Sequence, residues 1–251
     1  MPLTRILPAD LRLSSSISPL SNLVDKTGYH LALGASDNTN NLGVGIAFSR
    51  STNGSNIGSA IIFERTDSNS AGELQFYTKQ STATGADPTK SLTVSSGGEI
   101  LQHTQPAFNV KMTSASTTTF ITTTFSTIQF SGEVFDVGSN FSSYTFTAPV
   151  TGKYFFTSTV KVNTLINDNS NYWLRLNTSN RVYYGTIVDS NDLDNGGSLE
   201  FFTFNVQAVA DMDANDTAVV QIRREDGSSG ATISGDGTSS QYSYFHGYLL
   251  G

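Results

Sequence analysis

The residues of this chain that could perform chemistry are few and scattered. The three histidines, His30, His103 and His246, stand far apart, and none forms part of an HExxH-type pair, so they do not predict a zinc site. No GxSxG, P-loop or dinucleotide fingerprint occurs, and the glycines cluster with Ser and Asn as turn glycines do. The chain has no cysteine for a disulfide framework or a thiolate metal site. We therefore name no catalytic residue and expect a protein that is not an enzyme.

Two groups of acidic residues are the candidates for a metal site. They are Asp189, Asp192 and Asp194, and Asp211, Asp213 and Asp216. Several oxygen ligands on one loop suit a hard cation such as calcium. The spacing matches no EF-hand loop, so solvated turn residues are the alternative interpretation. We retain the second group as a candidate calcium site and expect no other cofactor.

Aromatic residues beside Asn-rich loops are the candidates for recognition. Tyr172 and Trp173 follow the segment NDNSN, and Tyr183 and Tyr184 also lie near a loop. A ring can stack on the face of a sugar while neighbouring Asn and Asp side chains bond its hydroxyls. These aromatic residues therefore predict a receptor- or glycan-binding site. Packing in a core explains the same residues equally well.

The composition indicates that the elements carrying these residues are β-strands. Charged residues make up 14% of the chain, below the roughly 25% of an average domain, and Ser, Thr, Asn and Gly fill the gap. Aromatic residues, at 11%, are enough to support a core. A net charge of −7 argues against nucleic acid as a partner, because phosphate backbones attract basic surfaces. No apolar run approaches the roughly 20 residues of a membrane span, so we expect no membrane insertion.

Alternating apolar runs between turn clusters predict an all-β protein in three parts. Residues 1–27 carry three prolines and predict an extended attachment arm. Residues 28–105 contain short strands separated by Asn- and Gly-rich turns and predict a small antiparallel β module, a shaft or an anchor. Pro106 resists inclusion in a central strand, so a second series of strands begins there and occupies residues 106–251.

Two motifs of the second series resemble those of a known family. FTAPVTGKYFF, from Phe146 to Phe156, resembles the signature segment of the globular heads of complement component 1q and tumour necrosis factor type. YFHGYLLG resembles the closing strand of these heads, and PAFNVKMT resembles their opening strand. The resemblance implies a jelly roll of two antiparallel sheets that assembles as a homotrimer. It also implies structural roles for Phe146, Pro149, Gly152, Tyr154, Phe156 and Gly247.

Aromatic residues on both parities of the strands agree with that implication. Consecutive rings occur at 154–156 and again at 201–202. One face of such a strand lines the sandwich, and the other needs a cover that a subunit interface would provide. The alternative is a monomer that buries both sets in a thick core.

The upstream module suggests where such a head would be used. KSLTVSSGGEI resembles the unit of strand, Gly turn and strand that recurs in bacteriophage fibre shafts. The chain has no Gly-X-Y repeat, so the sequence does not indicate a collagen stem. We therefore expect a virion structural protein: a homotrimeric tail fibre or appendage on the particle surface. Residues 1–105 would contact other virion proteins, and the head would bind a host receptor or glycan. The alternatives are a capsid decoration protein or head fibre and, more distantly, a glycan-degrading tailspike.

Overall fold

The structure is a computed structural model that divides the chain into two compact units, Met1–Thr104 and Gln105–Gly251. It describes residues 33–34, 38–52, 56–113, 118–120, 124–165, 171–193, 199–225, 231–235 and 240–251. The attachment arm expected at residues 1–27 lies outside these ranges. We call the second unit the head. The division falls one residue before the boundary expected at Pro106.

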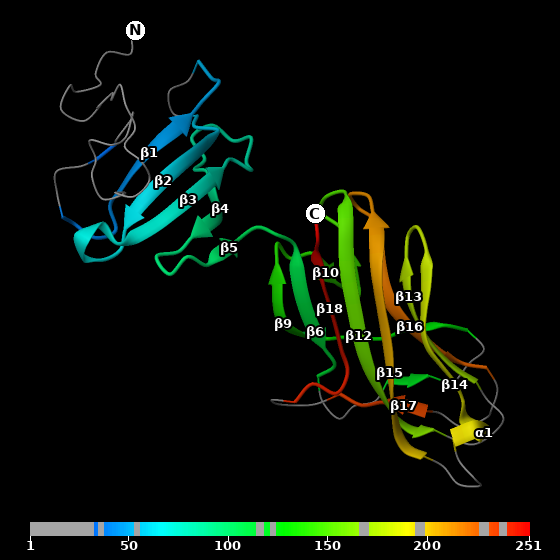
Figure 1. The fold of residues 1–251 in the computed structure, drawn as a ribbon. Coiled ribbons are helices and arrows are strands. Elements are labelled where there is room, and N and C mark those ends of the chain that lie inside the picture. The colour runs from blue at the N-terminus through cyan, green and yellow to red at the C-terminus, as the bar shows by residue number, and fades with distance from the viewer. Residues whose placement is uncertain are drawn as a thin grey trace, which may run out of the picture. The chain divides into compact units, whose positions relative to one another are not determined.

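The first unit contains a five-stranded antiparallel sheet in which sequence neighbours pair, in the order β1-β2-β3-β4-β5 (Figure 1). Its strands are β1 (Gly43–Phe48), β2 (Ser59–Arg65), β3 (Gly72–Thr78), β4 (Thr89–Val94) and β5 (Ile100–Gln102). A short 3-10 turn, η2 (Ser68–Ser70), joins β2 to β3, and Asp67 caps it by accepting the backbone N–H of Ser68. Asn- and Gly-rich connectors therefore make tight turns, as the sequence predicts.

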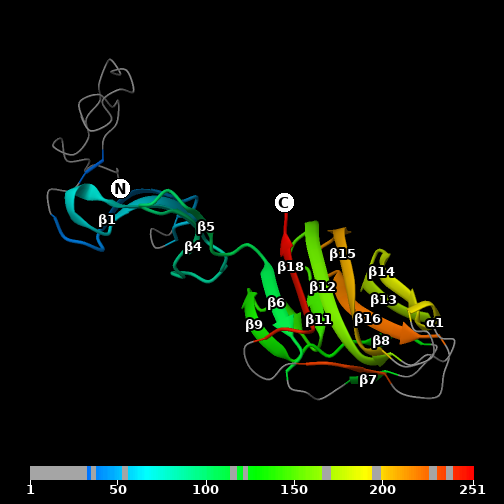
Figure 2. The same ribbon diagram turned by 60° about the horizontal axis from the view of Figure 1, so that its bottom comes forward.

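The head is a sandwich of two antiparallel sheets (Figures 1 and 2). The larger sheet runs in the order β7-β17-β12-β18-β6-β9, with β15 on the other edge of β12. Its strands are β6 (Ala107–Lys111), β7 (Thr118–Phe120), β9 (Gly132–Val137), β12 (Gly152–Leu165), β15 (Leu199–Met212), β17 (Ala231–Ile233) and β18 (Tyr244–Leu249). The strands β12 and β15 pair along almost their whole length and are the longest paired strands of this sheet.

The smaller sheet runs in the order β10-β11-β16-β13-β14, and β8 pairs with β16. Its strands are β8 (Ser126–Thr127), β10 (Phe141–Ser142), β11 (Thr145–Thr147), β13 (Asn171–Thr178), β14 (Val182–Asp189) and β16 (Thr217–Arg224). A single helical turn, α1 (Ser190–Leu193), follows β14. The principal strands β6-β18-β12-β15 therefore face β11-β16-β13-β14. This order is that of a jelly roll, and the predicted fold class is confirmed.

Stacked aromatic rings fill the space between the two sheets. Phe108 of β6 lies 4.8 Å from Phe146 of β11 and 4.9 Å from Phe245 of β18, measured between ring centroids. Tyr154 and Phe156 of β12 complete the cluster, and all of these side chains are at most 1% exposed. Offset and edge-on arrangements add to the free energy of burial, so this cluster is the centre of the head core.

The motif segment from Phe146 to Phe156 carries the chain from one sheet to the other. β11 pairs with β16 in the smaller sheet, whereas β12 pairs with β15 and β18 in the larger one, so the turn at 148–151 is not a hairpin. The hydroxyl of the buried Tyr154 donates a 2.8 Å hydrogen bond to the carbonyl of Val150 and ties the turn to the core. Burial raises the pKa of this hydroxyl, so it stays a donor at physiological pH.

The two sheets approach each other closely where β14 meets β15. A Cβ on Gly185 of β14 would lie 2.2 Å from the carbonyl oxygen of Asn205, so only glycine fits there. The hydroxyl of Thr186 bonds both the carbonyl and the amide of Asn205, which joins the layers at this side. In the described ranges, no helix is long and apolar enough to cross a membrane.

Candidate functional site

The predicted recognition residue Tyr172 lies in the core. Its side chain is fully buried, and its ring centroid lies 6.2 Å from that of Phe204 on the facing sheet. Residues of β13 alternate strictly between half-buried and buried, and Tyr172 has the inward parity. The prediction that Tyr172 contributes to a recognition surface is therefore wrong. Tyr183, which is opposite Leu176, is also partly buried against the core and offers little surface.

Trp173 and Tyr184 have the outward parity and come together on the outer face of the smaller sheet. Their ring centroids lie 5.7 Å apart, with the rings nearly perpendicular. Tyr184 is 53% exposed, so a ligand can reach it from solvent. A bulge between Trp173 and Arg175 shifts the β13–β14 register, which places Tyr184 opposite Arg175.

Two arginines and a third ring extend this pair into a larger cluster. The guanidinium carbon of Arg175 lies 3.5 Å from the ring centroid of Phe125. That of Arg223 lies 4.9 Å from the rings of both Phe125 and Trp173. Phe125 also lies 6.3 Å from Tyr184, again between centroids. We call Phe125, Trp173, Arg175, Tyr184 and Arg223 the aromatic-arginine cluster.

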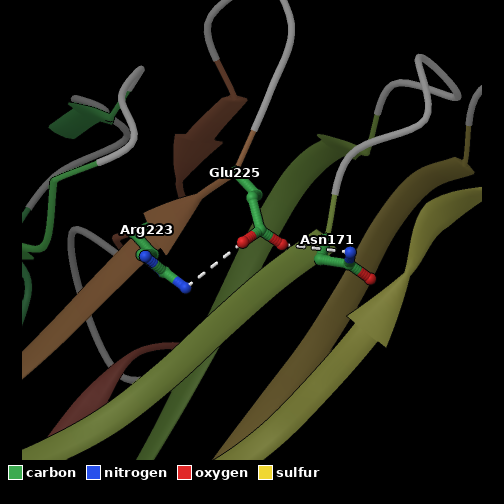
Figure 3. Close-up of polar contacts among 3 residues, drawn as sticks. All are labelled: Asn171, Arg223 and Glu225. Carbon is green, nitrogen blue, oxygen red and sulfur yellow. Dashed lines mark hydrogen bonds and ion pairs between the residues drawn. The ribbon is translucent and has the colours of Figure 1, made fainter.

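Neighbouring polar side chains hold the two guanidinium groups in place. Arg175 donates two hydrogen bonds, of 2.9 and 2.7 Å, to the side-chain oxygen of Gln221. Arg223 makes a 3.5 Å ion pair with Glu225, whose other oxygen accepts a 3.1 Å bond from Asn171 (Figure 3). Among the described residues, the hydrogen-bond partner of Arg175 is thus a neutral amide, which does not compensate its charge. Because the chain carries a net charge of −7, this cationic spot contrasts with the rest of the molecule.

The cluster suits a ligand rich in hydrogen-bond acceptors. The indole N–H of Trp173 and the Nε–H of Arg223 are both buried and have no acceptor among the described residues. Aromatic faces bind the apolar face of a sugar ring, and guanidinium groups bind carboxylate or hydroxyl oxygens. Sequence reasoning identified Trp173 and Tyr184 but missed Phe125, Arg175 and Arg223. Trp173 and Arg175 share the outward parity of one strand, and this was the signal in the sequence that could have identified Arg175.

The acidic residues predicted as a calcium site do not gather into one. Among the described residues, no group of three or more carboxylate or imidazole side chains is placed to hold a metal ion. Asp216 instead accepts hydrogen bonds from the Asn180 side chain, at 2.7 Å, and from the backbone N–H of Asp213, at 2.8 Å. Asp213 and Asp216 therefore lie in the turn between β15 and β16, and Asp211 lies in β15 opposite Lys153. Asp194, of the other acidic group, lies outside the described ranges.

The motif residues have structural positions. Phe146, Tyr154 and Phe156 are buried in the core, and Pro149 lies exposed in the turn that precedes β12. Gly152 begins β12 beneath Leu249, whose Cδ1 would lie 2.7 Å from an added Cβ. Gly247 of β18 lies against the ring of Phe156, where a Cβ would meet Cδ1 at 2.5 Å. The motif residues therefore contribute to the packing of the head. The aromatic-arginine cluster remains the candidate site.

The outer face of the larger sheet is a second surface of the head, and it carries exposed apolar side chains among polar ones. The pairing register places Tyr248, Phe155 and Val209 side by side across β18, β12 and β15. Large apolar side chains of this layer remain 44 to 57% exposed: Phe135, Phe201, Val209 and Tyr248. The described part of the chain therefore does not bury both parities of these strands in one thick core. We call this surface the head face.

Solved structures similar to this chain come from the same class of fold. The globular domain of zebrafish complement 1qA protein is 19% identical, covers 59% of this chain and 98% of its own, and has a TM-score of 0.41. Murine APRIL is 13% identical at a TM-score of 0.38, and it covers 58% of this chain and 99% of its own. The likeness concerns the fold alone. No protein-family model and no curated protein sequence matches the chain.

Proposed function

We propose that the head is a homotrimeric binding module that presents the aromatic-arginine cluster to a receptor or glycan. The observation that carries this proposal is the different chemistry of its two outer faces. The head face carries exposed apolar side chains, whereas the cluster on the opposite layer combines rings with guanidinium groups. A surface of the first kind is typical of subunit contacts, and one of the second kind suits a polar ligand.

The protein's place, on this proposal, is the surface of a virion. The separate β unit before the head supports an appendage in which one part attaches to the particle and the other binds the host. Three copies of a weak site would hold a particle firmly, because linked sites bind at a high effective concentration. Residues 1–105 would contact other virion proteins. The second candidate is a capsid decoration protein, which the small size of the first sheet favours.

The proposed role is not catalytic. Among the described residues, three titratable groups have displaced pKa values: Glu99 in a turn of the first unit, Tyr154 in the head core and His246 on the head face. Each displacement has a structural cause. A hydrogen bond from Ser95 lowers the pKa of Glu99, and burial displaces the other two. These causes are structural, which supports a binding role.

The trimer is tested by Val209→Glu, which places a charge on the head face at a position 53% exposed in the single chain. Light scattering should give a trimer for the native chain and a smaller species for the variant, because a buried, unpaired charge opposes association. The control is Val150→Glu in the turn before β12, where Val150 is 45% exposed and the trimer should persist. A native chain that is monomeric at micromolar concentration contradicts the proposal.

The ligand site is tested on a glycan array with the trimeric protein. Trp173→Ala and Arg175→Gln should each lower binding at least tenfold while the trimer and its thermal transition persist. The control is Asn177→Ala, on the same outward parity of β13 but outside the cluster. Equal binding by all three variants would remove the cluster from the proposed function. Imaging that places the chain on the capsid lattice would favour the decoration protein, and release of product from a host polysaccharide would contradict a non-catalytic role.

A further inference from the structure

The first sheet has an apolar face that extends across all five strands. Residues directly opposite one another in an antiparallel sheet project to the same side, so the pairing register defines this face. It carries Val44, Ile46, Phe48, Ile61, Phe63, Leu74, Phe76, Leu92, Val94 and Ile100. Ser59, Arg65 and Gln102 lie at its margins, and Arg65, its charged residue in the described strands, stands at the end of β2. We call this surface the shaft face.

The opposite side of the same sheet is polar and internally satisfied. Gln75, only 1% exposed, donates hydrogen bonds to the carboxylates of Glu64, at 2.6 Å, and Glu73, at 3.1 Å. Its side-chain oxygen accepts a 2.7 Å bond from Tyr77. Thr93, also 1% exposed, bonds His103 at 2.9 Å. Hydrogen bonds within the sheet thus satisfy these polar side chains. Among the described residues, the apolar side of the sheet is the one without such contacts.

The shaft face is open in the part of the chain that the structure describes. None of its apolar side chains is buried, and Phe48, Leu74 and Ile100 are 51, 39 and 65% exposed. These residues come from β1, β3 and β5, so the open surface spans the whole width of the sheet. Water in contact with a continuous apolar surface is unfavourable, and soluble monomers rarely expose one of this kind.

The size of the shaft face determines what can cover it. Five strands about 4.8 Å apart and about 20 Å long give a footprint of about 400 Å². A stable interface needs about 800 Å² from each partner, so this face is too small to hold two free chains together. It is large enough to pack when another contact already holds the copies. Its apolar centre suits an identical surface, because association there removes no charge from water.

The link to the head supplies that other contact. β5 ends at Gln102 and β6 begins at Ala107, so residues 103–106 are all that joins them. Such a segment spans at most about 18 Å. Copies that associate through the head face would therefore keep their first sheets close together, at an effective concentration in the millimolar range.

We propose that the shaft face packs against the shaft faces of other copies of this chain, so that the first units form a shared apolar core. This inference rests on the homotrimer proposed above. It assigns to the first sheet a role in self-association that is separate from the head face. Identical faces around one symmetry axis close the assembly and leave no apolar sheet surface in water.

The test uses the absence of cysteine, because each introduced cysteine is then the only one in its chain. Phe48→Cys, Leu74→Cys and Ile100→Cys place thiols on the shaft face at exposed positions that tolerate substitution. Leu101→Cys is the matched control: it neighbours Ile100 on β5, is 47% exposed and projects to the opposite side. After mild oxidation, at least one shaft-face variant should give disulfide-linked chains and the control none, because a disulfide needs Cα atoms within about 7 Å.

Light scattering on the same samples separates this inference from the proposed trimer. A trimer in which no shaft-face cysteine cross-links, and in which all three react freely with an alkylating reagent, overturns the inference and leaves the head trimer standing. A monomer overturns both. A monomer whose shaft-face cysteines resist alkylation means that another segment of the same chain covers the face.

A second measurement does not depend on disulfide geometry. Leu74→Glu should leave the mass of the trimer unchanged, because the head face is intact, and should raise its radius of gyration in solution scattering as the first units separate. Leu101→Glu should change neither quantity. An unchanged radius of gyration for Leu74→Glu contradicts the inference.

Discussion

Gly247 shows how a single residue limits the packing of the head. A Cβ at this position would meet Cδ1 of Phe156 at 2.5 Å and the carbonyl oxygen of Phe155 at 2.9 Å. The ring belongs to the buried core and the carbonyl to a paired strand, so neither can move freely. The resemblance to complement-type heads marked Gly247 as structural, and these contacts are the physical reason.

Gly247→Ala should lower the free energy of unfolding of the head by about 1 to 3 kcal/mol, the usual cost of overpacking a core. Urea unfolding followed by tryptophan fluorescence measures it, because Trp173 is the single tryptophan and lies in the head. Gly58→Ala is the control, since its Cβ would meet no heavy atom closer than 3.5 Å. Equal stability of the two variants would mean that β18 shifts to make room.

His246 gives the head face a dependence on pH. Its ring stacks on that of Tyr244 at 5.6 Å, and burial lowers its pKa below the ordinary 6.5. Above about pH 6.5 the ring is neutral in both folded and unfolded chains. As the pH falls below that value, the unfolded chain takes up a proton that the folded chain resists, so stability declines until the lowered pKa is passed.

Thermal unfolding of the native chain should therefore occur at lower temperature as the pH falls from 7 to 5, and His246→Gln should reduce that decline. His103→Gln, a change in the first unit, should keep the native pH dependence. An identical pH profile for His246→Gln and the native chain would show that other groups cause the decline.

At the scale of elements, the turn between β15 and β16 depends on Asp216. Its carboxylate joins Asn180 of the β13–β14 turn to the backbone of Asp213, and the backbone carbonyl of Asp216 accepts the amide of Ala148. Three connections of the head therefore meet at one residue. A metal ion is not needed to explain why the acidic residues lie here.

Asp216→Ala should lower the stability of the head by about 1 kcal/mol, because two hydrogen bonds to a carboxylate are lost. Asp216→Asn should lose less, since its side-chain oxygen still accepts. Calcium and chelator should leave the thermal transition of the native chain unchanged. A transition that rises with calcium would restore the metal interpretation.

The elements themselves were largely predictable. Alternating runs such as SAIIFER and YWLRLNT became β2 and β13, because apolar alternation matches the pleat. The short strands β10 and β17 were not predicted, since two or three residues carry no period. Pairing across the sandwich was also beyond local patterns, and the turn after β11 therefore read equally well as a hairpin.

At the scale of the molecule, stability should depend on protein concentration. A trimer that buries the head face in its contacts is stabilised by mass action, so its unfolding temperature rises with concentration. Scanning calorimetry over a hundredfold range should show this rise for the native chain and a smaller one for Val209→Glu. A native unfolding temperature that stays constant over that range would contradict a reversible trimer.

The sequence by itself determined an all-β chain, its two series of strands and the motifs of the head, because composition, alternation and turn residues are local properties. Only the tertiary structure decided which side of each strand faces inward. Tyr172 and Trp173 are adjacent aromatic residues, and nothing local distinguishes them. The core took Tyr172 and left Trp173 outside, where Arg223 of another strand meets it. A one-residue shift in register would exchange their places, and long-range packing alone selects the register.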